Sequence, residues 1–176
     1  MIADLRLPAA LTAGTQDLLL RRATPDDLTA ILVLLSDDPV SAARGDRADG
    51  ADGADVTAYA RALRDVVEDP GNDLLVAVDA AGDVVGTFQL TRIPGMARRG
   101  STRLLVEAVR VRSTSRSAGI GSALMRWVTD VAAPAVGASL VQLTSDEARV
   151  EAHRFYERLG FVGSHRGFKR AVQPES

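Results

Sequence analysis

The chain contains 176 residues, of which 46% are apolar and 25% are charged, and its formal net charge is −2. This length supports one domain with a substantial core and is too short for two domains of ordinary size. Basic and acidic residues are mixed along the chain, which argues against nucleic-acid binding, and the absence of cysteine excludes disulfides, thiolate metal sites and a cysteine nucleophile.

The same composition bears on cellular location and on metal binding. The absence of cysteine suits a reducing compartment, and no segment reaches the roughly 18 apolar residues that cross a bilayer. The first residues lack both the basic start and the long apolar run of a signal peptide. Two histidines are too few for a histidine cluster. We therefore expect a cytoplasmic protein with no membrane partner and no metal.

A strand and a helix are the first elements that the sequence predicts. Residues 1–16 show no regular pattern, because Pro8 and Gly14 interrupt it, and we expect a loosely held extension. Residues 18–23 are typical of a strand, and Thr24-Pro25-Asp26-Asp27 supplies an N-cap, a first-turn proline and two acids. The helix that follows has an apolar stripe of Leu28, Ile31, Leu32 and Leu35.

Residues 41–55 contain no apolar residue larger than alanine and cannot order themselves by burial. Their aspartates, at 46, 49, 52 and 55, raise the alternative of a calcium loop. An EF-hand needs a different alternation and a closing glutamate, where this chain has Thr57, so we expect a solvent-exposed loop. A second helix follows and ends at Pro70-Gly71, with Tyr59, Leu63, Val66 and Val67 on one face.

A β-hairpin and a further strand make up the middle of the chain. Residues 74–78 and 84–91 are β-rich and flank Asp79-Ala80-Ala81-Gly82-Asp83, which has glycine at a left-handed turn position. The two strands should therefore pair antiparallel. Residues 93–102 are expected to form a basic, exposed loop. Residues 104–111 are short and rich in branched apolar residues, as in a buried strand.

The segment Arg116-Ser117-Ala118-Gly119-Ile120-Gly121 lies between this strand and a predicted amphipathic helix. In that helix Arg126 and Asp130 fall on the solvent side, and the apolar stripe consists of Ile120, Leu124, Trp127, Val128 and Val131. Two glycines leave backbone N–H groups uncovered, and a helix start adds unpaired donors and a dipole that favours an anion. Strand, glycine loop and helix together predict a site for a phosphate or pyrophosphate group.

The remaining residues predict a strand, a helix and a short final β segment. Residues 139–144 are typical of a strand. The next helix has Gly160 as its C-cap and carries Ala148, Ala152, Phe155, Tyr156 and Leu159 on one face. Residues 161–172 are expected to form one or two short strands.

The order of these elements and two motifs resemble the GNAT superfamily of N-acetyltransferases over residues 17–171. Arg116-x-x-Gly119-x-Gly121 stands where that family has its (Gln/Arg)-x-x-Gly-x-(Gly/Ala) pyrophosphate loop, and residues 152–161, AHRFYERLGF, are similar to its A-x-x-F-Y-x-x-x-G-F helix. The resemblance implies an α/β (α+β) fold with a single acetyltransferase domain over residues 17–176. Its mixed sheet of six to seven strands would splay between the fourth and fifth strands and be flanked by about four helices.

The resemblance also implies acetyl-coenzyme A as co-substrate, held in the opening of the sheet. Its pantetheine arm would bind the backbone of the motif strand much as an added strand does, and its pyrophosphate would bind the loop amides. Arg116 would either add positive charge there or only cap the turn. The implied cofactor-binding residues are Val109, Arg110, Val111, Arg116, Ser117, Ala118, Gly119, Ile120, Gly121, Ser122 and Phe155.

Two residues are candidates for catalysis through this resemblance. Tyr156 matches a tyrosine that protonates the departing thiolate in relatives, and core packing is the alternative role. Glu107 matches a carboxylate that takes the proton of the amine, and an ion pair with an arginine such as Arg103 is the alternative role. A base is useful because an alkylamine with a pKa near 10 is mostly charged at neutral pH and cannot attack a thioester in that form.

One departure from the family pattern concerns the segment before the A-x-x-F-Y helix. Relatives often carry an asparagine there, whereas residues 146–151 contain none, so Thr144, Ser145 and Asp146 are the candidates to replace its hydrogen bond. His153 falls off the apolar stripe and is expected to be exposed. Neither histidine has a G-x-S-x-G serine to activate, which argues against hydrolase chemistry.

The leading hypothesis is direct transfer of an acetyl group from acetyl-coenzyme A to a primary amine of a small molecule or peptide. The alternative is a non-catalytic acyl-coenzyme A sensor or regulatory domain, which the presence of both Glu107 and Tyr156 disfavours. A dinucleotide-binding module would need the complete G-x-G-x-x-G pattern. The acceptor is not readable from the sequence, although the acid-rich loop favours a cationic one. An exposed strand edge offers a route to a homodimer.

Overall fold

The computed structural model describes residues 1–37 and 53–172. The chain divides into two compact units, residues 1–143 and residues 144–176. Of the predicted loop at 41–55, the last residues form the start of helix α3 (Gly53–Glu68). Asp46, Asp49 and Asp52, which raised the calcium alternative, lie outside the described residues.

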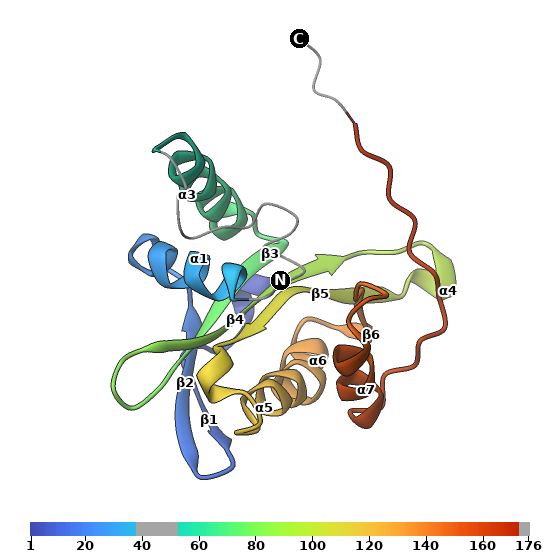
Figure 1. The fold of residues 1–176 in the computed structure, drawn as a ribbon. Coiled ribbons are helices and arrows are strands. Elements are labelled where there is room, and N and C mark those ends of the chain that lie inside the picture. The colour runs from blue at the N-terminus through green and yellow to red at the C-terminus, as the bar shows by residue number, and fades with distance from the viewer. Residues whose placement is uncertain (38–52, 173–176) are drawn as a thin grey trace. The chain divides into compact units, whose positions relative to one another are not determined.

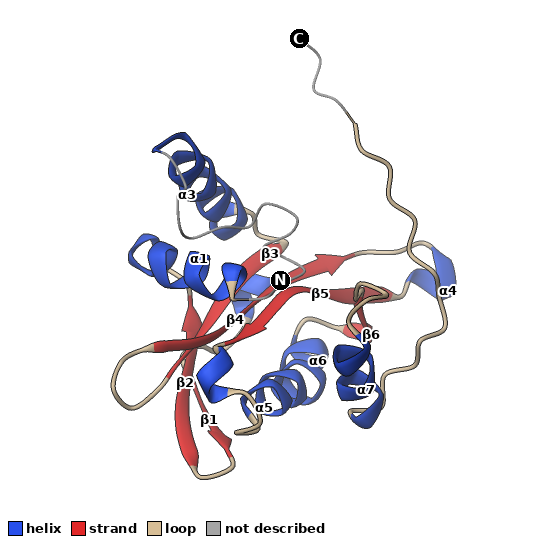
Figure 2. Cartoon of the chain, viewed as in Figure 1, coloured by secondary structure: helices blue, strands red, loops and turns tan. Residues whose placement is uncertain are grey.

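The first unit is built on a mixed six-stranded sheet in the order β1 to β6 (Figures 1 and 2). Its strands are β1 (Ala9–Ala13), β2 (Gln16–Arg22), β3 (Asn72–Val78), β4 (Val84–Ile93), β5 (Thr102–Val111) and β6 (Ala138–Leu143). Neighbours from β1 to β5 pair antiparallel, and β6 pairs parallel with β5. The predicted hairpin of β3 and β4 is confirmed, with Gly82 in its turn at a φ of 90°.

The first residues of the chain belong to this sheet and its core, so the expectation of a loosely held segment is wrong for them. One turn of 3-10 helix at Ile2–Asp4 precedes β1, which pairs along its whole length with β2. Ile2, Leu5 and Ala13 are buried. Alanine occupies most of β1, and small side chains give too weak an alternation for the strand to be recognised from the sequence.

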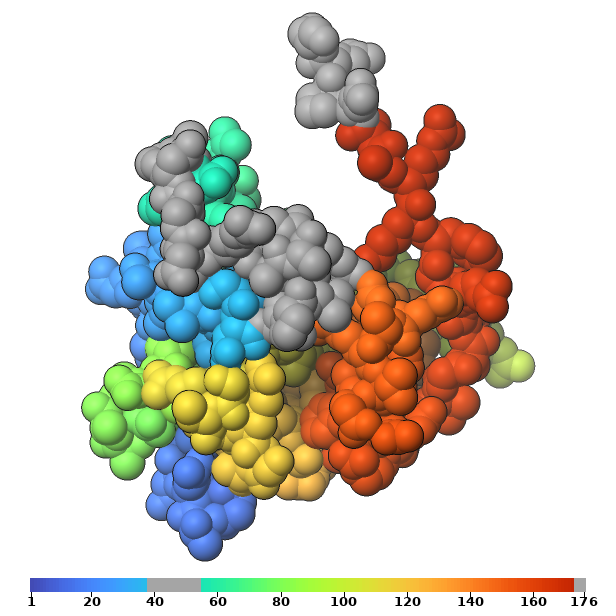
Figure 3. Space-filling model, viewed as in Figure 1, coloured from blue at the N-terminus to red at the C-terminus, as the bar shows by residue number. Residues whose placement is uncertain are grey.

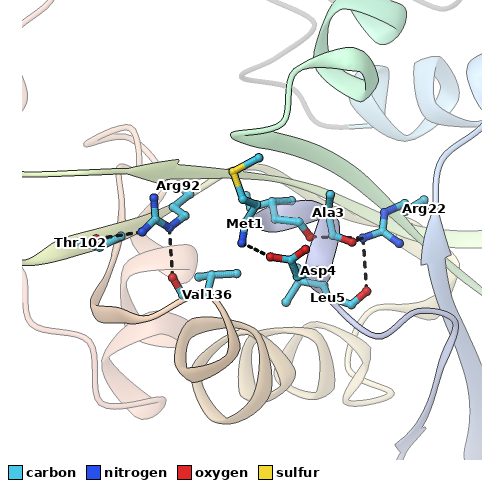
Figure 4. A network of polar contacts seen from close by, with 9 residues as sticks. Met1, Ala3, Asp4, Leu5, Arg22, Arg92, Thr102 and Val136 are labelled. Atoms are coloured by element: carbon cyan, nitrogen blue, oxygen red, sulfur yellow. Dashed lines mark hydrogen bonds and ion pairs between the residues drawn. The ribbon is translucent and has the colours of Figure 1, made fainter.

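Two arginines bind backbone carbonyls around this N-terminal segment (Figure 4). Arg22 of β2 donates to the carbonyl oxygens of Ala3 and Leu5, at 3.1 and 3.3 Å, and its Nε forms an ion pair with Asp73 at 2.7 Å. Arg92 of β4 donates from Nε to the carbonyl oxygen of Val136 at 3.1 Å. Each guanidinium thus satisfies carbonyl groups that regular secondary structure leaves unpaired.

Helices cover both faces of the sheet (Figure 1). On one face, α1 (Leu28–Ser36) and α3 share a buried cluster with β3, in which Ile31 and Leu63 pack with Val76. On the other face, α5 (Ile120–Trp127) packs against β4, where the rings of Phe88 and Trp127 meet edge to face with centroids 6.3 Å apart. Both predicted N-terminal helices are confirmed, but Val67 of α3 is exposed, because the packed stripe of that helix is narrower than expected.

Helix α5 continues into a π-helix at Val128–Ala132 and then into the short α6 (Ala133–Ala135). A π-helix bonds residue i to residue i+5, so it shifts the buried stripe by one position. Ala132 is fully buried, whereas Val131 is 49% exposed, and the prediction that Val131 lies on the apolar stripe is wrong. Arg126 and Asp130 are exposed, as predicted.

The predicted basic loop before β5 contains a single helical turn, α4 (Ala97–Gly100). Within it Arg98 and Arg99 have positive φ angles of 53° and 58°, and both side chains are exposed. After this turn, β5 pairs with β6 only over Thr102–Val106, and residues 107–111 extend beyond the paired region. The splay predicted between the fourth and fifth strands therefore lies between β5 and β6. The numbers differ by one because β1 was not among the strands predicted from the sequence.

The second unit contains α7 (Val150–Arg158), which confirms the helix predicted there. Gly160 follows it with a φ of 86°, as expected of a C-cap glycine. Residues 161–172 form neither helix nor strand and are largely exposed, so the predicted final strands are wrong (Figure 2). Gly163 and Gly167 interrupt this segment, and glycine weakens a strand. Within the described parts of the chain, no helix is long and apolar enough to cross a membrane.

Candidate functional site

The loop between β5 and α5 ends at the N-terminus of an eight-residue helix. Ser117 and Gly119 in this loop have positive φ angles of 69° and 86°, and Gly119 is the N-cap of α5. The first helical hydrogen bond runs from the amide of Ala123 to the carbonyl of Gly119 at 3.0 Å, so the amides of residues 119–122 precede helical pairing. Together with the helix dipole, these amides form a cradle suited to an anion.

Arg116, which is exposed, links this loop to the end of β5 and to the residue after α1. Its Nε donates to the carbonyl oxygen of Val111 at 3.3 Å, and its NH2 group donates to the carbonyl oxygen of Asp37 at 2.6 Å. The carboxylate of Asp37, in turn, accepts a hydrogen bond from the amide of Ser113 at 2.6 Å. Asp37 lies just after α1, and Figure 3 shows the loop (yellow) at the surface beside the end of that helix (light blue). No local sequence signal marked Asp37 as a partner of the loop.

The turn between β1 and β2 lies against the other side of the loop. A Cβ atom on Gly14, whose φ is 60°, would lie 3.3 Å from the carbonyl oxygen of Ala118. A Cβ atom on Gly119 would lie 3.6 Å from the amide nitrogen of Gly14. The two glycines therefore let the hairpin and the loop approach closely, which fixes the loop from a part of the chain that the sequence did not connect with it.

The motif strand β5 contains a β-bulge at Ala108. Its pairing with β4 runs from Glu107–Gln89 to Arg110–Thr87, so two residues of β5 oppose the single residue Phe88. Ala108 has a φ of 51°, a left-handed conformation that alanine rarely adopts. Strained backbone of this kind is often found at functional sites. The bulge begins where the pairing of β5 with β6 has ended, so residues 107–111 combine an irregular backbone with an edge that β6 does not pair with.

Glu107 is exposed and lies directly opposite Gln89 in the register of the two strands. Directly opposite residues project from the same face of a sheet. Arg103, the arginine considered as its partner, donates instead to the side-chain oxygen of Gln142 at 3.2 Å. Within the described residues the carboxylate of Glu107 has no ion-pair partner, so the structure does not support the ion-pair alternative.

An open cavity of about 140 Å³ lies between the sheet and the helices α1 and α3. Its lining is formed by Leu28, Ile31, Leu32, Leu35, Tyr59, Ala62, Leu63, Val66, Leu74, Thr87, Gln89 and Ala108. Two of these residues belong to the bulge region: Ala108 follows Glu107 in sequence, and Gln89 is its cross-strand partner. The apolar stripes predicted for the two helices supply most of the remaining wall.

In the second unit, the A-x-x-F-Y-x-x-x-G-F motif forms a capped helix end. The amide of Phe161 bonds to the carbonyl of Tyr156 at 3.1 Å and that of Gly160 to the carbonyl of Glu157 at 2.9 Å, which is the Schellman pattern. The ring of Tyr156 lies between those of Phe155 and Phe161, with centroid distances of 5.0 and 5.8 Å. Phe155 and Tyr156 are both half-buried. Much of the motif therefore serves to end the helix and to pack three aromatic rings together.

The segment before α7 is held by Asp146, one of the three residues proposed to replace an asparagine. Its carboxylate accepts from the amide of Ala148 at 2.9 Å, which forms an Asx turn before the helix instead of an N-cap on it. The Nε2 atom of His153 lies 2.8 Å from the carbonyl oxygen of Asp146. His153 is half-buried by this contact, and the prediction that it is exposed is wrong.

Two carboxylates of the first unit have shifted pKa values, and both belong to its framework. Hydrogen bonds from Arg21, at 2.7 and 2.8 Å, hold the pKa of Asp27 below its usual range, and bonds from Thr24 add to this effect. Burial raises the pKa of Asp73, although its ion pair with Arg22 acts in the opposite direction.

Among the residues that the structure describes, no group of three or more acidic or histidine side chains could hold a metal ion.

Comparisons with known proteins agree with this fold. The profile of the acetyltransferase (GNAT) family matches residues 28–161, so the chain belongs to the acetyltransferase (GNAT) family. The match includes β5, the glycine loop, α5 and α7. Members of this family use acetyl-coenzyme A as co-substrate, as the resemblance implied.

The individual proteins that this chain resembles carry names that describe different functions. A transcriptional regulator from Bacillus halodurans is 37% identical, with a TM-score of 0.80 over 88% of this chain and 99% of that one. An acetyltransferase from Trypanosoma brucei is 27% identical, with a TM-score of 0.65 over 89% of this chain and 100% of that one. The aminoalkylphosphonate N-acetyltransferase of Salmonella typhimurium is 42% identical over 57 residues, which are 32% of this chain and 36% of that enzyme.

Proposed function

We propose that the protein is an acetyl-coenzyme A-dependent N-acetyltransferase that acts on a primary amine of a small molecule or peptide. One observation carries the proposal: the bulged end of β5, which β6 does not pair with, leads directly into a loop whose amides precede the first helical hydrogen bond of α5. An elongated ligand with an amide-bearing arm and a phosphate group matches this succession, because the edge offers backbone hydrogen bonds and the loop offers anion binding.

In this proposal, backbone groups of Val109, Arg110 and Val111 bind the pantetheine arm, with the carbonyl oxygens of Val109 and Val111 also accepting hydrogen bonds from the side chains of Arg110 and Arg116 at 2.8 and 3.3 Å. The amides of Ser117, Ala118, Gly119, Ile120, Gly121 and Ser122 bind the pyrophosphate, and Arg116 acts mainly through the shape of the loop. Its guanidinium is already bonded to Val111 and Asp37, which supports this role. Phe155, in the second unit, is assigned to cofactor binding from its motif alone. When bound, the thioester supplies an activated acetyl carbon.

Glu107 and Tyr156 are proposed to act as base and acid in the reaction. Glu107 accepts a proton from the ammonium group, which frees the nitrogen lone pair to form the bond to the acetyl carbon as the bond to sulfur breaks. Tyr156 donates its hydroxyl proton to the departing thiolate. The attacking nitrogen then releases its second proton to solvent, which leaves a neutral amide and restores the protonated Tyr156 hydroxyl through solvent. The carboxylate of Glu107 is exposed and has no ion pair with any residue that the structure describes, which supports its part. The assignment of Tyr156, in the second unit, rests on its motif.

The experiment that tests this function measures thiol release from acetyl-coenzyme A in the presence of a panel of primary amines. The purified protein is expected to release thiol in proportion to the N-acetylated amine formed. Gly121→Val should raise the dissociation constant for acetyl-coenzyme A by about tenfold or more, because a branched side chain would stand among the donor amides. Gly163→Val is the matched control, since a Cβ at this exposed glycine would meet nothing within 4 Å. Equal affinity in both variants would contradict the assignment of the loop.

A second function, an acyl-coenzyme A sensor without turnover, is favoured by the name of the Bacillus halodurans relative, a transcriptional regulator. The same assay separates the two functions. Tight binding of acetyl-coenzyme A without thiol release for any amine would support the sensor. Turnover with an aminoalkylphosphonate would instead extend the acceptor of the Salmonella typhimurium enzyme to this chain.

A further inference from the structure

The cavity between the sheet, α1 and α3 has an uncharged and mainly apolar lining. Leucine, isoleucine, valine and alanine side chains form most of it, and none of the lining residues that the structure describes carries a formal charge. Two of its polar groups are already used: the hydroxyl of Thr87 donates to the carbonyl oxygen of Leu75 at 2.9 Å, and the amide of Gln89 donates to the side-chain oxygen of Asn72 at 3.3 Å. The cavity therefore suits a hydrocarbon group better than an ion.

The cavity also lies on the face of the sheet from which Glu107 projects. Gln89, the direct cross-strand partner of Glu107, lines it, and Ala108 of the bulge lines it as well. The loop that carries the proposed pyrophosphate site leads into α5, which packs on the opposite face through Phe88 and Trp127. A group in the cavity would thus approach the bulge from the side of the proposed base.

We propose that this cavity binds a compact apolar substituent of the acceptor, so that the preferred acceptors are primary amines bearing a branched alkyl or aryl group. The inference rests on the proposed function and names the class of its substrate. The acceptor fills the cavity, rather than a lengthened acyl group of the donor, because the cavity and Glu107 share one face of the sheet. The charged groups of phosphonates and polyamines meet no counter-charge among the described residues of its lining.

The volume sets the size of the substituent. An engineered apolar cavity of about 150 Å³ in another protein holds benzene, so a space of about 140 Å³ suits a phenyl ring or a branched chain of about four carbons. Each methylene group that leaves water for such a site improves binding by about fourfold. Longer chains should gain nothing further once the cavity is full.

The test compares acceptors that share one amino group and differ in their apolar part. Ethylamine, butylamine, isopentylamine and phenethylamine are assayed with acetyl-coenzyme A, next to putrescine and an aminoalkylphosphonate. We expect kcat/KM to rise by about three- to fourfold per added carbon up to isopentylamine, with phenethylamine at a similar level. Putrescine and the phosphonate should be poorer than butylamine by at least tenfold.

A pair of variants on α3 locates the effect. Ala62 and Ala58 both lie at exposed positions of this helix, but only Ala62 belongs to the lining of the cavity. Ala62→Leu should lower kcat/KM for isopentylamine and phenethylamine by about tenfold and leave that for ethylamine within twofold, because the added carbons occupy part of the space. Ala58→Leu should change none of these values. Thermal unfolding of both variants shows whether the fold is retained.

Several outcomes would overturn the inference while leaving the proposed function intact. Turnover with polar amines and no gain for apolar ones is the first, and equal effects of Ala62→Leu and Ala58→Leu are the second. A third is a change by Ala62→Leu in the preference among acetyl-, propionyl- and butyryl-coenzyme A without a change among amines, which would assign the cavity to the acyl group.

The proposed function fails by a different result, the lack of thiol release with every amine. In that case calorimetry with the coenzyme A-saturated protein still decides the inference. Phenethylamine should bind at least tenfold more tightly than ethylamine, and Ala62→Leu should abolish that difference. Equal binding of the two amines would refute the inference as well.

Discussion

At the scale of single residues, the exposed carboxylate of Glu107 allows a sharp test of the proposed base. Glu107→Gln keeps the size of the side chain and removes its ability to accept a proton. We expect kcat to fall by about 100-fold at neutral pH, the lower range for a general base. The loss should shrink toward high pH, because the free amine then forms without help. The dissociation constant for acetyl-coenzyme A should stay within twofold.

Steady-state kinetics over a range of pH, with one amine in excess, provide the measurement. Glu68→Gln, a change of the same kind at the exposed end of α3, serves as the control and should behave as the unchanged protein does. Turnover of Glu107→Gln at the level of this control would remove Glu107 from the mechanism.

Single residues also show where sequence reasoning stops. Gly119 could be predicted at a left-handed position, since glycine is the residue that adopts it without strain, and the structure gives it a φ of 86°. Ala108 and Ser117 adopt the same region of backbone space, yet neither residue type announces it. Their conformations are imposed by the bulge and by the loop contacts, which depend on strands and helices far away in the chain.

At the scale of elements, the strands and helices with strong apolar periodicity were predicted, and those with weak patterns were not. β3, β4, α1 and α3 follow from local sequence, because their apolar side chains repeat at the period of each element. β1 was missed, because its stability comes from pairing with β2 and not from its own small side chains. The final strands predicted over residues 161–172 are wrong for a different reason. Strand-forming residue types are not sufficient for a strand, which also needs a neighbouring strand to pair with.

The tie between α1 and the glycine loop is a second feature of this scale, and it can be tested at Asp37. Asp37→Ala removes the acceptor for the amide of Ser113, 2.6 Å away, and leaves the proposed phosphate-binding amides in place. We expect the dissociation constant for acetyl-coenzyme A to rise by about three- to tenfold, in line with the loss of one charge-assisted hydrogen bond at a partly exposed site. Isothermal titration calorimetry measures this change.

Two further variants keep this prediction specific. Asp37→Asn retains an oxygen acceptor for the amide of Ser113 and should recover most of the affinity. Asp65→Ala, at an exposed position of α3, should have no effect. Unchanged affinity in Asp37→Ala would show that the loop keeps its shape without the tie.

At the scale of the whole molecule, two buried carboxylates should give the folding stability opposite dependences on pH. Asp27 has a lowered pKa in the folded state, because Arg21 and Thr24 bond to its charged form. Its contribution is present above the pKa of the unfolded chain and is lost as the pH falls through the folded value. Asp73 has a raised pKa through burial, so between the two values the folded state binds more protons and stability falls as the pH rises.

Thermal unfolding of Asp27→Asn and Asp73→Asn between acidic and neutral pH tests this pair of signs. Asp27→Asn should lose about 2 kcal/mol at neutral pH, or about 4–8 °C in Tm, since two charge-assisted bonds from Arg21 are weakened. That deficit should narrow as the pH falls. For Asp73→Asn, the difference in Tm from the unchanged protein should shift toward greater relative stability of the variant as the pH rises. For each variant, the quantity to compare is its difference in Tm from the unchanged protein. If this difference changed with pH in the same direction for both variants, the opposite pKa shifts assigned to Asp27 and Asp73 would be contradicted.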